Sequence, residues 1–135
     1  MTNHWLLIIA FIFVATLATL NAMALHFYWY WTLRWFDIPM HLLGGMWAAT
    51  MAMWALTRRV HNYSPRSQVF FVLFFVLVVG IVWELFEALF LGIYTEPGYL
   101  FDTAQDLLSD LCGGAIGYLL ALRLTRPFAL ESRLS

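Results

Sequence analysis

The sequence predicts an all-α membrane protein with four membrane-spanning helices. Of its 135 residues, 63% are hydrophobic and only 11% are charged, whereas a soluble domain carries about 25% charged residues. The mean hydropathy is +0.78. Four apolar segments each approach the roughly 20 residues that a spanning helix needs. A soluble globular enzyme is therefore excluded.

The four apolar segments account for most of the chain. We expect a single transmembrane domain over residues 1–135, since the length leaves room for one domain only. Its helices are expected at about residues 5–25, 38–56, 69–94 and 103–124. The first segment lacks a basic N-terminal region and a convincing cleavage site, so we interpret it as a retained helix rather than a signal peptide.

Local signals mark the helix ends. Ser64 followed by Pro65 is typical of an N-cap and a first helical residue, and predicts the start of the third helix. Asp102 with Gln105 fits a capping box at the start of the fourth helix. The aromatic segment 26–36 follows the first helix and suits a membrane–water interface.

The sequence contains no lysine, and the distribution of its seven arginines predicts how the helices are oriented in the membrane. Only Arg34 lies between the first two helices. The loop after the second helix and the C-terminal tail contain the others: Arg58, Arg59, Arg66, Arg123, Arg126 and Arg133. Cytoplasmic loops are enriched in basic residues, so we expect both termini and the middle loop inside. The net charge of −1 argues against a nucleic-acid partner.

Six of the eight acidic residues fall in or beside the second, third and fourth helices, leaving Glu96 and Glu131 outside. They are Asp37, Glu84, Glu87, Asp102, Asp106 and Asp110. Spacings of three or four residues place each set on one helical face. At 1.5 Å per residue, all lie within about 12 Å of the outer helix ends. His41 lies one turn below Asp37, so we expect one polar pocket that opens to the outer side.

An acidic pocket in a membrane needs compensation, because an ionised Asp at the centre of a spanning helix costs roughly 2.5–3.5 kcal/mol. Bound cations, shared protons or a water-filled cavity would supply it. Carboxylates with one imidazole suit Mg²⁺, Mn²⁺, Ca²⁺, Fe²⁺ or Zn²⁺. The expected ligands are His41, Glu84, Asp102, Asp106 and Asp110, with Glu87 or Asp37 as general base and Arg34 on a substrate phosphate.

Each of these residues also has a purely structural interpretation. Asp37 and Asp102 could be N-caps only, and a lone His41 is more often a hydrogen-bonded core residue than a ligand. Glu84 and Glu87 could share a proton without a metal. Glycines on the second and fourth helices, including the Gly113-x3-Gly117 pair, favour close helix packing over a substrate cavity.

The acidic motifs carry a family resemblance over residues 37–117. Asp37-x3-His41-x2-Gly44, Glu84-x2-Glu87 and Asp106-x3-Asp110-x2-Gly113 resemble the pattern of VanZ-like membrane proteins, and Trp83-Glu84-x2-Glu87 with FDTAQDLLSD is similar to YjdF-like proteins. VanZ-like proteins usually have Gln and Asn where this chain has Glu87 and Asp110. The resemblance implies a bacterial inner membrane and work on the cell envelope.

Three classes of function remain open. The first is a metal-dependent hydrolase or transferase that acts on a lipid or lipid-linked phosphate at the outer leaflet, with the metal activating water. The second is a proton- or cation-coupled transporter that uses the carboxylates as a relay. The third is a non-catalytic accessory subunit. Membrane lipids are the expected partners, and a homo-oligomer is left open.

Overall fold

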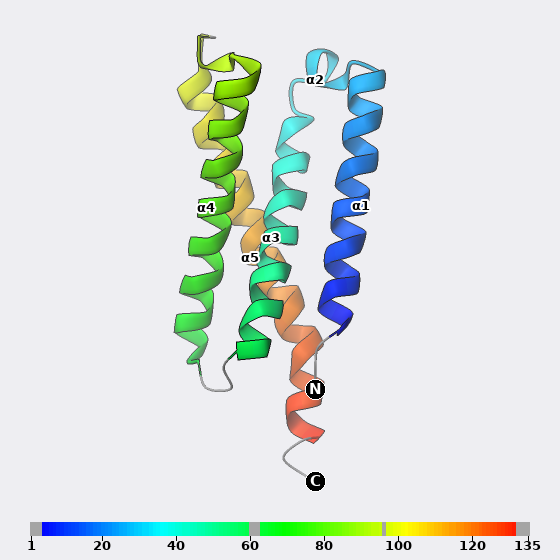
Figure 1. Cartoon of the computed structure of the whole chain (residues 1–135), viewed down its shortest axis with the longest axis vertical. Coiled ribbons are helices and arrows are strands. Elements are labelled where there is room, and N and C mark those ends of the chain that lie inside the picture. The colour runs from blue at the N-terminus through cyan, green and yellow to red at the C-terminus, as the bar shows by residue number, and fades with distance from the viewer. Residues whose placement is uncertain (1–3, 60–62, 96, 132–135) are drawn as a thin grey trace.

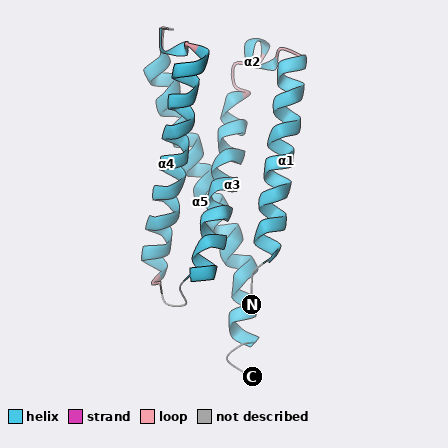
Figure 2. Cartoon of the chain, in the orientation of Figure 1, coloured by secondary structure: helices cyan, strands magenta, loops and turns pink. Residues whose placement is uncertain are grey.

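The computed structural model describes residues 4–59, 63–95 and 97–131, with side chains undescribed for Arg59, Ile93 and residues 126–131. Glu96 and Arg133 lie outside the described residues. The elements are α1 (His4–His26), α2 (Trp29–Thr32), α3 (Asp37–Arg59), α4 (Pro65–Leu91), η1 (Ile93–Thr95) and α5 (Tyr99–Glu131). Helices are the only regular elements among the described residues, as Figure 2 shows. The expected all-α class is confirmed.

The four long helices stand side by side, with α2 capping one end (Figure 1). The central helix is α3, which packs against α1, α4 and α5, most extensively against α5. The first turn of α1 and the last turns of α5 both lie at the end opposite α2 (Figure 1). Long helices thus bring the predicted acidic faces of α3, α4 and α5 to one end of the bundle.

Three of the described helices are long and apolar enough to cross a membrane: α1, α4 and the Tyr99–Thr125 part of α5. The expected fourth, α3, is as long as α1 at 23 residues but is not among them. It carries Asp37 and His41 in its first two turns and ends in two arginines. Because α3 packs against three neighbours, it exposes less surface to its surroundings and needs a less apolar composition.

Several expected boundaries are shifted in the structure. The prediction of a start at Ser64 is confirmed: its side chain accepts a hydrogen bond from Ser67 N, with Pro65 as the first helical residue. The capping box at Asp102 is wrong, because α5 already begins at Tyr99 and places Asp102 inside its first turn. α4 ends at Leu91 rather than Tyr94, because Gly92 takes a left-handed conformation with φ 70°.

The aromatic segment forms α2, a short helix that the sequence did not indicate. Trp29 and Tyr30 place their rings against Phe36, with centroids 5.3 and 5.4 Å apart. Phe36 is buried, whereas the neighbouring Trp31 and Trp35 are exposed. Packing on Phe36 therefore orders this connection and holds Tyr30 over the acidic end of the bundle.

Glycines let α3 and α5 approach until their backbones touch. A Cβ on Gly45 would meet the carbonyl oxygen of Asp110, and one on Gly113 would meet the carbonyl oxygen of Leu42. A Cβ on Gly117 would lie 2.7 Å from the carbonyl oxygen of Met46. The predicted packing role of these glycines is confirmed, and it fixes the register between the two helices that carry His41 and Asp110.

The hydrophobic core lies in the half of the bundle nearer the chain termini. It consists of Leu6, Ala48, Ala49, Ala52, Met53, Leu56, Val72, Val76, Tyr118 and Ala121. Small alanines on α3 admit the larger side chains of α4 and α5. The opposite half holds the buried charged residues, so the bundle has one apolar end and one acidic end.

Candidate metal centre

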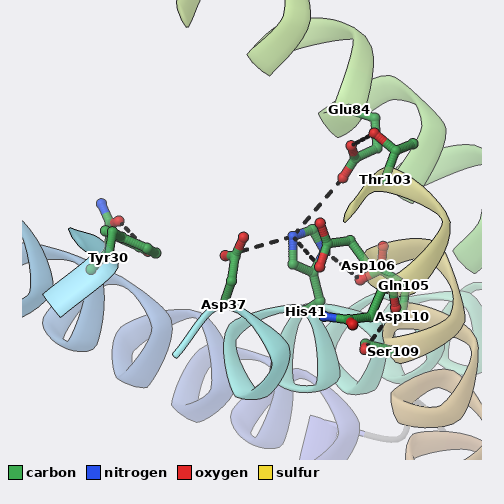
Figure 3. Close-up of polar contacts among 10 residues, drawn as sticks. Tyr30, Asp37, His41, Glu84, Thr103, Gln105, Asp106, Ser109 and Asp110 are labelled. Carbon is green, nitrogen blue, oxygen red and sulfur yellow. Dashed lines mark hydrogen bonds and ion pairs between the residues drawn. The ribbon is translucent and has the colours of Figure 1, made fainter. Parts of the chain in front are cut away.

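His41 is the centre of a cluster of carboxylates from three helices (Figure 3). Its Nε2 lies 3.8 Å from Asp37 Oδ1, 4.0 Å from Glu84 Oε1 and 3.9 Å from Asp106 Oδ1. Its Nδ1 lies 3.4 Å from Asp110 Oδ1. We call these five residues the His41 cluster. The sequence spacing predicted this convergence, and the structure confirms it.

Most of the His41 cluster is shielded from its surroundings. The exposed fraction is 6% for His41, 5% for Glu84, 3% for Asp106 and 6% for Asp110. Asp37 is half-buried and begins α3. Two helices, α4 and α5, therefore contribute deeply buried acids around His41 of α3, and Asp37 stands at the rim of the cluster.

Three carboxylate oxygens in the cluster are buried without a hydrogen-bond partner. They are Glu84 Oε1, Asp106 Oδ1 and Asp110 Oδ2. Buried polar atoms normally have a partner, and an unpaired one costs about 1–3 kcal/mol, with charged groups costing more. Three such oxygens in one place indicate a site that a further positive group or protons complete.

No arginine supplies that positive charge among those whose side chains the structure describes. The ion pairs in the cluster all use His41. One imidazole can offset at most one of four carboxylates. Buried charges are normally paired or coordinated to a metal. The cluster therefore has more negative charge than its one imidazole can offset, and a bound cation would balance it.

Further side chains hold the carboxylates in position. Thr103 donates a hydrogen bond of 2.8 Å to Glu84 Oε2, the oxygen that does not face His41. Gly80 on α4 makes room for Asp110, since a Cβ there would lie 2.5 Å from Asp110 Oδ2. These contacts orient Glu84 and Asp110 from outside the cluster, as hydrogen-bonding groups around the ligands do at metal sites.

Two overlapping sets of residues have the geometry for metal ligation. Asp37, His41 and Asp106 each offer a ligand atom within 4.8 Å of the others. His41, Glu84 and Glu87 do the same. Hard oxygen donors with one imidazole suit divalent cations. The structure thus contains a buried His/Asp/Glu cluster that could hold a metal ion.

A cavity of about 340 Å³ opens beside the cluster. Its walls come from α1, α3 and α4, with Asp110 of α5 and Tyr30 of α2 also lining it. Asp37, His41, Glu87 and Asp110 line it on one side. The volume of this cavity is at the lower end of the range for ligand pockets. A small molecule in the cavity would therefore reach the cluster.

A comparison with protein families gives a match over nearly the whole chain. The family model of predicted membrane proteins named DUF2238 matches residues 2–127. The chain belongs to the DUF2238 family. No curated protein and no solved structure matches the chain. Membership agrees with the apolar helices and identifies a membrane protein.

Membership in the DUF2238 family corrects the resemblance to VanZ-like and YjdF-like proteins, because the matching model describes a different family. The Asp-x3-His and Glu-x2-Glu spacings that carried the resemblance are short. Any membrane helix that places two polar groups on one face needs a spacing of three or four residues. Such motifs therefore report helix geometry more strongly than ancestry.

Two residues expected at the site lie away from the His41 cluster. Asp102, expected as a ligand, is exposed in the first turn of α5, one turn above Asp106. Arg34, expected on a substrate phosphate, is exposed between α2 and α3. Glu87, expected as a base, is half-buried and lines the cavity.

The sequence interpretation missed Thr103, Gly80 and Tyr30. Thr103 could have been found, because positions 103, 106 and 110 follow one face of a helix. Gly80 and Tyr30 carry no comparable signal. Their roles depend on the approach of α4 to α5 and on the fold of α2 over the bundle.

Proposed function

We propose that the His41 cluster binds one divalent cation and that the protein is an enzyme acting on a phosphate-bearing lipid or lipid-linked substrate of the cell envelope. The observation that carries the proposal is the set of three buried carboxylate oxygens without partners, on Glu84, Asp106 and Asp110. A cation bound within the cluster would supply the positive charge that these oxygens lack. It would also offset the cost of gathering four carboxylates around one imidazole.

We further propose that α3 is a fourth membrane crossing. Its 23 residues span about 34 Å at 1.5 Å per residue, enough for a hydrocarbon core of about 30 Å. Four crossings agree with the first turn of α1 and the last turns of α5, which lie at the same end of the bundle (Figure 1). The arginine distribution favours an orientation with both ends in the cytoplasm and the cluster toward the outer side.

The proposal gives each residue a chemical role. His41, Glu84, Asp106 and Asp110 are the cation ligands, with Asp37 or Glu87 as general base at the rim. When bound, a divalent cation neutralises phosphate oxygens and makes water more acidic. The half-buried carboxylates of Asp37 and Glu87 line the cavity, where they can take a proton from that water. Asp102 and Arg34 have no role in this arrangement.

A transporter that moves protons or cations is the second candidate, because the same unpartnered carboxylates could hold protons. A complete path would have to continue toward the end of the bundle that holds the chain termini. There the buried residues that the structure describes carry no charge, and the hydroxyl of Thr50 bonds the backbone of its own helix. This packing favours an enzyme over a transporter, because it offers no charged groups to continue a path for protons or cations.

The deciding experiment measures bound metal by elemental mass spectrometry on protein purified in detergent. We compare the wild type with an Asp106→Asn, Asp110→Asn double variant, and use Asp102→Asn as the matched control on the same helix. One ion per chain in the wild type and in the control, lost in the double variant, would support the site. Inorganic phosphate released from lipid phosphates, only with metal present, would then support the enzyme.

Other results would lead elsewhere. Absence of metal from all three proteins after supplementation with divalent ions would overturn the cation site. Cation flux into proteoliposomes that Asp106→Asn abolishes would favour transport. Tight metal binding without turnover would favour an accessory subunit.

A further inference from the structure

The cavity beside the His41 cluster is a groove between α1 and α4, with α3 as its floor. Val14, Leu17 and Ala18 of α1 form one wall, and Val76, Val79 and Trp83 of α4 form the other. Figure 1 shows α1 and α4 on either side of α3. Two of the described membrane-spanning helices therefore frame the groove over its length.

The two ends of the groove differ in polarity. Tyr30 donates a hydrogen bond of 2.9 Å to Asn21 at one end, where Asp37 and Glu87 also lie. Apolar side chains of Val14, Ala48 and Val76 line the other end. The groove thus offers polar groups at the end covered by α2 and hydrocarbon below it.

The length of the groove matches one leaflet of a bilayer. Asp37 and Ala48 are eleven residues apart on α3, and Glu87 and Val76 are eleven apart on α4. Each separation is about 16 Å at 1.5 Å per residue. A bilayer's hydrocarbon core is about 30 Å thick, so one leaflet supplies about half of that. The two helices give the same length independently.

The groove also communicates with the surrounding lipid. Val14 on one wall is 42% exposed and Trp83 on the other is 50% exposed. Ala18, one turn after Val14 on α1, is exposed as well. Residues that line the groove and also face outward mark a side opening between α1 and α4, through which a chain could enter without crossing water.

We propose that this groove holds one hydrocarbon chain of a phosphate-bearing lipid, which enters sideways between α1 and α4 and brings its head group to Asp37, Glu87 and the His41 cluster. The placement of the head group rests on the proposed cation site, whereas the placement of the chain rests on the groove alone. The apolar lining, the polar end and the half-bilayer length all fit this occupant. A water-soluble substrate would leave the apolar part of the lining without a partner.

The test is photo-crosslinking in nanodiscs of phosphatidylethanolamine and phosphatidylglycerol. The probe is a phosphatidic acid with a diazirine in its acyl chain, and the labelled residues are mapped by peptide mass spectrometry. We expect labels at Leu17, Met40 and Trp47 inside the groove, above the level at outward-facing Phe90, which reports lipid around the protein. Labels at Phe90 alone would overturn the proposal.

A matched pair of variants tests the groove itself. Ala18→Trp fills it from an exposed position on α1, whereas Ala15→Trp adds the same ring to an exposed position outside it. Labelling of groove residues should fall to the surrounding-lipid level in Ala18→Trp and stay unchanged in Ala15→Trp. Equal labelling in the two variants would contradict the proposal. Mapping on the wild type decides the case even if Ala18→Trp does not fold.

Two further arms separate the outcomes. Unlabelled dioleoyl phosphatidate or a polyprenyl phosphate should compete for the groove label, and the stronger competitor identifies the chain type; a groove label that neither one reduces would count against the proposal. Bound metal is measured in the same samples. Groove labelling without metal would leave the hydrocarbon site standing and remove the cation site. Metal without groove labelling would do the reverse.

Discussion

Nδ1 of His41 on α3 lies 3.4 Å from Oδ1 of Asp110 on α5, in the same turn where Gly45 faces the carbonyl oxygen of Asp110. The two contacts reinforce each other. Without a side chain at Gly45, the helix backbones touch, and this close approach brings the carboxylate to the imidazole. The acidic cluster therefore depends on glycine packing as much as on acidic residues.

Gly45→Ala should separate α3 from α5 and destabilise the protein. Its Cβ would collide with the carbonyl group of Asp110, which backbone movement alone can relieve. Overpacking of this kind costs about 1–3 kcal/mol. We expect a lower thermal unfolding midpoint in detergent. Gly44→Ala is the control, since its Cβ would lie at an ordinary 3.7 Å from Asp110 Oδ1; equal midpoints for the two variants would refute the packing argument.

Gly80→Ala should weaken the cation site with little effect on folding. Its Cβ would lie 2.5 Å from Asp110 Oδ2, at the end of a side chain that can rotate away. Moving a ligand out of position typically costs about 10–100-fold in metal affinity. Competition with a chelator measures this loss. If Gly80→Ala and Gly44→Ala bind the metal equally well, Asp110 is not a ligand.

Thr103→Val should lower metal affinity through Glu84. The Thr103 hydroxyl holds Glu84 Oε2 at 2.8 Å and leaves Oε1 facing His41. Loss of such an orienting hydrogen bond costs about 10–100-fold in affinity. Thr125→Val is the matched control, because that hydroxyl bonds only backbone carbonyls of its own helix. Wild-type affinity in Thr103→Val would exclude the orienting role.

Tyr30 should remain protonated far into the alkaline range. Burial, together with the nearby charges of Asp37 and Glu87, raises the pKa of its phenol to about 12. Both effects disfavour the tyrosinate, so the hydrogen bond to Asn21 should persist at every pH below about 12. A tyrosinate absorbance titration of wild type minus Tyr30→Phe should show a single component near that value. A component near pH 10 would show that Tyr30 is exposed to solvent.

Much of the acidic site could be predicted from spacing. Asp37 and His41, then Asp106 and Asp110, are separated by one helical turn, so each pair had to share a face. Glu84 joined them because α4 runs opposite to α3 and reaches the same end. Asp102 shares the face of Asp106 but lies one turn higher, in the first turn of α5, where its side chain is exposed.

The sequence by itself determined the membrane class, the long helices and the gathering of acids at one end, because hydropathy and a 3.6-residue period are properties of the chain alone. Only the tertiary structure decided that α2 folds back over that end, that Gly80 makes room for Asp110, and that α1 and α4 frame a groove. These features depend on the distances between helices. Such distances are set by side-chain packing at several helix contacts together, which no local pattern records.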